Sequence, residues 1–191
     1  DLLVKSLRGR LRVISMSSEK MENIDRIVDQ IDEKDHIVVY CGDGKLFDDQ
    51  TGAELRHIQA IKKVLAQHEY KASQFTATES MDEGINIPSI KSALILSSND
   101  DYREFVQRRG RILRLYKNKQ YAKIYDVIVL PPNDMSTWAK IELRRYREYA
   151  HLALNWNELQ DDLNGRLMEY GLTEEDVNAY DYEDMEVDVD E

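Results

Sequence analysis

Apolar residues recur along this chain with two alternating spacings, which together predict an α/β fold. Short β-branched runs predict buried parallel strands, and apolar residues three and four positions apart predict amphipathic helices. The predicted helices cover residues 17–33, about 53–69, 102–114, 136–155 and 156–170. The predicted strands cover residues 37–41, 72–76, 93–96 and 122–130. Strands that alternate with helices in this way indicate a parallel sheet with helices on both faces.

The alternating pattern ends at Pro131 and Pro132. We therefore expect the main domain to span residues 17–132 and a helical extension to span residues 133–172. Residues 173–191 contain ten acidic residues and no Lys or Arg, which predicts an acidic tail. Residues 1–16 begin abruptly and mix apolar with basic side chains, so we expect them to lead in from a preceding region.

The net charge of −11 comes almost entirely from the acidic tail. The chain has 37 Asp and Glu residues and 26 Lys and Arg residues. Without the ten acidic residues of the tail, 27 acidic and 26 basic residues remain, a net charge of −1. The acidic balance therefore does not exclude a nucleic-acid-binding domain. Basic residues gather at positions 8–12, 103–123 and 144–147.

Composition also restricts the compartment and the chemistry. The single cysteine, Cys41, excludes an internal disulfide framework, and the four scattered histidines predict no metal site. The apolar runs are too short to cross a membrane, and the N-terminal residues lack the organisation of a signal peptide. We expect no membrane partner and an intracellular location, cytoplasmic and nucleoid-associated in a prokaryote or virus and nuclear in a eukaryote.

The strongest chemical signal is segment 107–114, which reads Gln-Arg-Arg-Gly-Arg-Ile-Leu-Arg. If the helix runs from 102 to 114, Arg111 and Arg114 lie one turn apart on one face, with Gln107 a turn earlier. A guanidinium stays charged and matches phosphate oxygens two at a time. Gly110 permits close approach of a backbone or a nucleotide. The segment therefore predicts phosphate binding, and a basic surface helix paired with carboxylates is the alternative.

A second segment, Met-Asp-Glu-Gly-Ile-Asn-Ile-Pro at 81–88, precedes the predicted strand 93–96. In this order the two segments resemble motifs V and VI of superfamily 2 helicases and translocases, whose motif VI reads Q-x-x-G-R-x-x-R. Residues 37–42 resemble motif IV, and residues 73–76 resemble a strand end that touches the nucleic-acid backbone. The resemblance covers about residues 10–155 and implies the second RecA-like domain, closest to excision-repair (xeroderma type) and phage-defence or restriction-associated DNA helicases.

The resemblance implies an ATP-facing set of residues. Arg111 and Arg114 would be arginine fingers, which stabilise charge that develops on a transferring phosphoryl group. Gln107, Gly84 and Asn86 would line the nucleotide side of the cleft. Asn86 stands where the family more often has aspartate, and for Gly84 a simple turn glycine is the alternative.

The resemblance also implies a nucleic-acid-facing set. Gly42, Lys45 and Thr76 would approach the phosphates of DNA, with RNA as the alternative, through contacts that fix position without reading sequence. For Lys45 and Thr76, a solvated loop or strand-end position is the alternative.

Two parts of the motor are absent from the sequence. Neither a Walker A nor a Walker B motif occurs, so ATP and Mg²⁺ would be bound mainly by a first RecA-like domain, in cis or in trans. Ser80 runs directly into Met81 where the family has a helix and a strand, so we expect missing residues between positions 80 and 81.

We therefore expect the C-terminal motor domain of an ATP-dependent DNA helicase or translocase, inactive as an ATPase by itself. The alternative is a non-catalytic interaction module that docks on a protein partner through its C-terminal helices and acidic tail.

Overall fold

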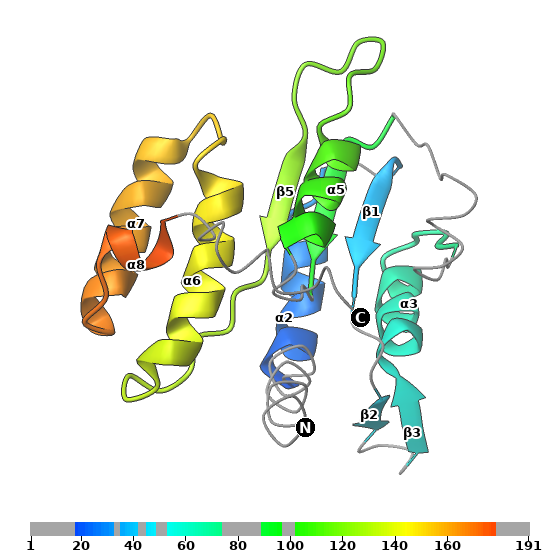
Figure 1. The fold of residues 1–191 in the computed structure, drawn as a ribbon. Coiled ribbons are helices and arrows are strands. Elements are labelled where there is room, and N and C mark those ends of the chain that lie inside the picture. Colours follow the sequence, from blue (N-terminus) through cyan, green and yellow to red (C-terminus); the bar gives the residue numbers. More distant parts are fainter. Residues whose placement is uncertain are drawn as a thin grey trace, which may run out of the picture. The chain divides into compact units, whose positions relative to one another are not determined.

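The computed structural model describes residues 18–32, 35–41, 45–48, 53–73, 89–96 and 102–178. The chain divides into two compact units, residues 1–127 and 128–191. The helices of the first unit are α2 (Ser18–Val28), α3 (His57–Gln67) and α5 (Tyr102–Ile112). Its strands are β1 (Ile37–Tyr40), β2 (Lys45–Asp48), β3 (Ala53–Arg56), β4 (Ser92–Ile95) and β5 (Lys123–Asp126). The second unit contains α6 (Ser136–Ala150), α7 (Trp156–Glu169) and α8 (Glu174–Val177) (Figure 1).

The first unit is built on a three-stranded parallel sheet with the order β1-β4-β5. All four residues of the central strand β4 are buried. Parallel strands covered on both faces are usually near-continuous apolar runs, which explains Ala93-Leu94-Ile95. The predicted parallel sheet is therefore confirmed, as a small sheet in a mixed α/β unit.

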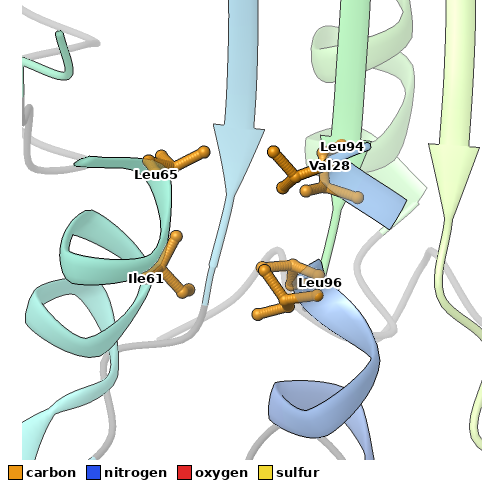
Figure 2. Close-up of a cluster of buried hydrophobic side chains, with 6 residues drawn as sticks. Val28, Ile61, Leu65, Leu94 and Leu96 are labelled. Carbon is orange, nitrogen blue, oxygen red and sulfur yellow. The ribbon is translucent and has the colours of Figure 1, made fainter. Parts of the chain in front are cut away.

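Helices cover both faces of this sheet, as the pattern predicts. On one face, Ile61 and Leu65 of α3 point toward Val28 of α2 and toward Leu94 and Leu96, and all five are buried (Figure 2). Each such aliphatic side chain contributes about 1.5–3 kcal/mol when it leaves water. Because neighbouring residues of a strand point to opposite faces of the sheet, Leu94 and Leu96, two residues apart, point to the same face.

The opposite face of the sheet is covered by α5. Val39 of β1 packs in the cluster beside α2 and α3, so its neighbour Tyr40 faces the other side. There the guanidinium carbon of Arg108, from α5, lies 4.8 Å from the centre of the Tyr40 ring.

The predicted helix 53–69 is wrong over its first four residues. Residues 53–56 form β3, which pairs antiparallel with β2 so that Lys45 faces Arg56 and Leu46 faces Leu55. Ala53, Glu54 and Leu55 favour a helix locally, but pairing with a neighbouring strand overrides that preference. Lys45 is therefore the first residue of a strand, a strand-end position.

Other elements were predicted with shifted ends. Helix α2 stops at Val28 instead of residue 33, and α6 stops at Ala150 instead of residue 155. Strand β5 is shorter at both ends than the predicted 122–130. In the predicted strand 72–76, Ala72 and Ser73 are not in a strand, and the rest lies outside the described residues.

The second unit is a small helical cluster. Ala139 and Leu143 of α6 are buried against Leu163 and Leu167 of α7, together with Val177 of α8. These helices confirm the predicted helical pattern after the two prolines. The division of the chain after Val127 lies five residues before the predicted domain end at 132.

Polar contacts fasten the ends of the second unit. The hydroxyl of Tyr170 donates a hydrogen bond to the carbonyl of Pro131. The backbone amide and hydroxyl of Thr173 both donate to Asp176 at 2.9 Å, and these bonds lower the pKa of Asp176. The first residues of the predicted acidic tail thus form the capped helix α8, and residues 179–191 lie outside the described part. In the described residues no helix has the length and apolar character to cross a membrane.

Candidate phosphate site at the end of helix α5

Helix α5 places Gln107 and Arg111 on one face, because they are four residues apart within the helix. The Gln107 side chain is exposed and Arg111 is half-buried. Arg109 and Arg111 lie in the last turn, where the helix dipole favours cations. This end of α5 therefore presents donors and positive charge together.

The chain leaves the helix before it reaches Arg114. The last helical hydrogen bond here runs from the amide of Leu113 to the carbonyl of Arg109 at 2.9 Å. The carbonyls of Ile112 and Arg114 instead accept hydrogen bonds from the ammonium of Lys119, at 2.5 and 3.1 Å. The expectation that the helix continues to 114 is therefore wrong, and Arg114 follows the helix instead of lying on its face.

Lys119 reaches these carbonyls because a tight turn folds the chain back. The amide of Lys119 donates to the carbonyl of Tyr116 at 3.0 Å, and Asn118 adopts a left-handed conformation with φ of 64°. Asparagine tolerates this conformation better than most residues. Burial lowers the pKa of Lys119. We call residues 113–121 the 113–121 loop.

The topology brings this loop to one edge of the sheet together with residues 89–91, which follow the segment 81–88. Helix α5 starts after the carboxyl end of β4 and must return to the amino end of β5, because the two strands are parallel. At that amino edge, the amide of Lys123 donates to the carbonyl of Lys91 at 2.8 Å. Figure 1 shows the loop extending beyond the amino end of β5. Lys91 and Lys123 thus lie side by side at the edge of the sheet from which the 113–121 loop extends.

Four of the remaining predicted site residues, Gly42, Thr76, Gly84 and Asn86, lie outside the described residues. Lys45 begins β2, which pairs with β3 in a hairpin separate from the parallel sheet. Of the predicted residues, Gln107 and Arg111 therefore lie on α5, and Arg114 lies just after its end.

Sequence reasoning missed Lys119. A lysine a few residues beyond a helix, next to an Asn that can reverse the chain, is the only local sign of its capping role. No group of three or more His, Cys, Asp or Glu in the described ranges has the arrangement of a metal site. His68 instead links helices, with its two ring nitrogens 3.0 and 3.1 Å from Asp25 and Asp29.

Comparison with known proteins gives one informative similarity. A stretch of 70 residues, 37% of this chain, is 30% identical to a protein named "Putative helicase 22" from Sulfolobus islandicus filamentous virus (isolate Iceland/Hveragerdi). The chain spans 12% of the length of that viral protein. No protein-family model matches the chain, and no solved structure matches it. The similarity supports a relationship to helicases, without a finer subfamily.

Proposed function

We propose that this chain is the second RecA-like motor domain of an ATP-dependent DNA helicase or translocase of superfamily 2, in which RNA is the alternative substrate. The similarity to the viral protein supports the helicase relationship, and the parallel sheet covered on both faces is consistent with a RecA-like domain. The observation that carries the proposal is the placement of Gln107 and Arg111 on one face of α5, with Arg114 directly after the helix end.

The residues at the end of α5 suit a polyphosphate. Residues 105–125 contain seven Lys or Arg and no Asp or Glu. Such a segment fits the phosphates of ATP and does not fit Mg²⁺, which binds carboxylates and phosphates. Mg²⁺ with ATP, held mainly by a first RecA-like domain, would neutralise charge on the phosphates.

In this proposal Arg111 and Arg114 act as arginine fingers toward the γ-phosphate, and Gln107 links the nucleotide state to domain closure. Gly84 and Asn86 line the same cleft. ATP binding would close the two motor domains, and hydrolysis would reopen them.

The nucleic-acid groove would be formed in part by Gly42, Lys45 and Thr76, through phosphate contacts that do not depend on base sequence. The chain by itself would then have negligible ATPase activity, because no Walker A or Walker B motif occurs in it.

The test is DNA-stimulated ATP hydrolysis by the intact parent protein. Arg111→Ala and Arg114→Ala should each lower the rate roughly a hundredfold or more, with nucleotide and DNA binding largely kept. Arg26→Ala is the matched control, because Arg26 is an exposed arginine in the last turn of another helix, α2. Unchanged hydrolysis in both finger variants would reject the assignment.

One observation favours the alternative of an interaction module. Leu154, after α6, and Met168, on α7, are 94% and 81% exposed, so both apolar side chains are accessible to a partner. If the finger variants hydrolyse ATP normally, docking of a protein partner on the second unit becomes the leading function. Substituting Leu154 and Met168 with serine should then weaken assembly of the parent complex.

A further inference from the structure

The 113–121 loop carries exposed rings and aliphatic groups that ATP hydrolysis does not require. Tyr116 is 52% exposed, Tyr121 is 62% exposed and Leu115 is 88% exposed. Several large apolar side chains exposed in so short a segment are unusual on a surface that has no binding partner. They also lie within residues 105–125, which contain no acidic residue.

The loop is held in shape before any ligand arrives. The hydrogen bond from the Lys119 amide to the Tyr116 carbonyl closes the turn. The Lys119 ammonium also donates hydrogen bonds to the carbonyls of Ile112 and Arg114. A surface ordered in advance loses less conformational entropy on binding. The ring of Tyr116 is therefore presented from a fixed turn.

We propose that the 113–121 loop is a stacking surface for single-stranded nucleic acid. The exposed rings of Tyr116 and Tyr121 would stack on unpaired bases, and the exposed ammonium of Lys117 would contact the phosphate backbone. Positive charge alone would fit any polyanion, and exposed rings alone would fit an apolar groove on a protein. Their combination in one loop favours a strand that offers both bases and phosphates.

The preference for a single strand follows from base accessibility. In a duplex each base is already stacked on its neighbours inside the helix, so a surface tyrosine reaches it only after unstacking. Base–aromatic stacking is also tolerant of sequence, because every base has a π-face. The loop should therefore bind single strands more tightly than duplexes and show little sequence preference.

This inference goes beyond the proposed motor function, because it assigns contact to a loop outside the predicted groove residues Gly42, Lys45 and Thr76. Its test needs neither ATP nor a first RecA-like domain. A failure of the stacking surface would leave the arginine-finger assignment standing, and the reverse also holds.

The experiment measures binding of the full chain to a fluorescein-labelled thymidine oligonucleotide by fluorescence anisotropy, at fixed salt and without nucleotide. Tyr116→Ala and Tyr121→Ala should each weaken binding by roughly five- to a hundredfold. Tyr116→Phe and Tyr121→Phe should bind as the wild type does, because they keep the ring. Leu115→Ala removes an apolar side chain from the same loop and should have little effect.

Salt dependence tests the role of Lys117. Lys117→Ala should reduce the slope of log affinity against log salt by about 0.7, the value expected for one phosphate contact to a single strand. Lys62→Ala, at an exposed lysine of α3, is the matched control and should leave the slope unchanged. Circular dichroism melts should show that all variants remain folded.

Two results would overturn the proposal. One is that the tyrosine-to-alanine variants bind the oligonucleotide no more weakly than Leu115→Ala. The other is that a duplex of the same length binds as tightly as the single strand and loses affinity equally in all variants, which would indicate electrostatic attraction alone.

Discussion

The hydrogen bond between Tyr146 and Asp162 makes the second unit lose stability at alkaline pH. The Tyr146 hydroxyl donates to Asp162 at 3.0 Å, and burial, followed by this bond, raises the pKa of Tyr146 from 10.0 to about 12. Because the folded pKa lies above the unfolded pKa, the folded state holds the proton more tightly. The stabilisation is therefore complete below pH 10 and is lost as the pH rises through 12.

The size of this effect follows from the pKa difference. Each pKa unit corresponds to roughly 1.4 kcal/mol, so the full difference would give roughly 2.7 kcal/mol. Water screens the half-buried Tyr146, so we expect about 1 kcal/mol in practice. Replacing Tyr146 with Phe removes the ionisable hydroxyl and its hydrogen bonds, which contribute about 1 kcal/mol at neutral pH.

The assay uses the tryptophans, because the two in the chain, Trp138 and Trp156, both lie in the second unit. Their fluorescence during urea unfolding should show Tyr146→Phe less stable than wild type by about 1 kcal/mol at pH 8, with the difference shrinking above pH 10. Tyr121→Phe, an exposed position in the first unit, should match wild type at every pH. A difference for Tyr146→Phe that stays constant up to about pH 11.5 would refute the reasoning.

Three further outcomes are expected. Leu94→Ala should destabilise the first unit by about 2–5 kcal/mol in urea unfolding followed by circular dichroism, because Leu94 is fully buried. Leu115→Ala, at an exposed position, should change the free energy of unfolding little. Glu142→Ala should lower the free energy of unfolding of the second unit by about 3–5 kcal/mol, followed by tryptophan fluorescence, because Glu142 lies 3.0 Å from the buried Arg145 guanidinium. The double variant Glu142→Met with Arg145→Met should restore much of this stability. Lys119→Met should speed hydrogen exchange at the amide of Leu113, because the carbonyls at the end of α5 lose their cation; an unchanged exchange rate would show that Lys119 does not hold this end.

The sequence predicted best those elements whose pattern is long or strongly apolar. Strand β1 and helix α7 lie within one residue of the predicted ranges, and α6 begins where it was predicted, because a buried face needs a regular repeat. The strand β3 could not be predicted in the same way. Its residues 53–56 favour a helix in isolation, and only pairing with β2 makes them a strand.

The candidate site was predictable in part for the same reason. The spacing of Gln107 and Arg111 follows from the helical repeat, so their common face was predicted correctly. Where Arg114 departs from the helix, its carbonyl accepts a hydrogen bond from the Lys119 ammonium, five residues further on. A lysine that caps carbonyls leaves no periodic pattern, so this part of the geometry required the structure.

Lys119 also gives the two proposals a physical connection. Its ammonium binds the carbonyl of Arg114, the residue proposed to face ATP, while its backbone amide closes the turn that presents Tyr116. A strand stacked on Tyr116 would therefore act on a turn that shares its anchor with Arg114. Coupling between two sites requires an element whose arrangement both sites affect, and under the two proposals this turn would be that element.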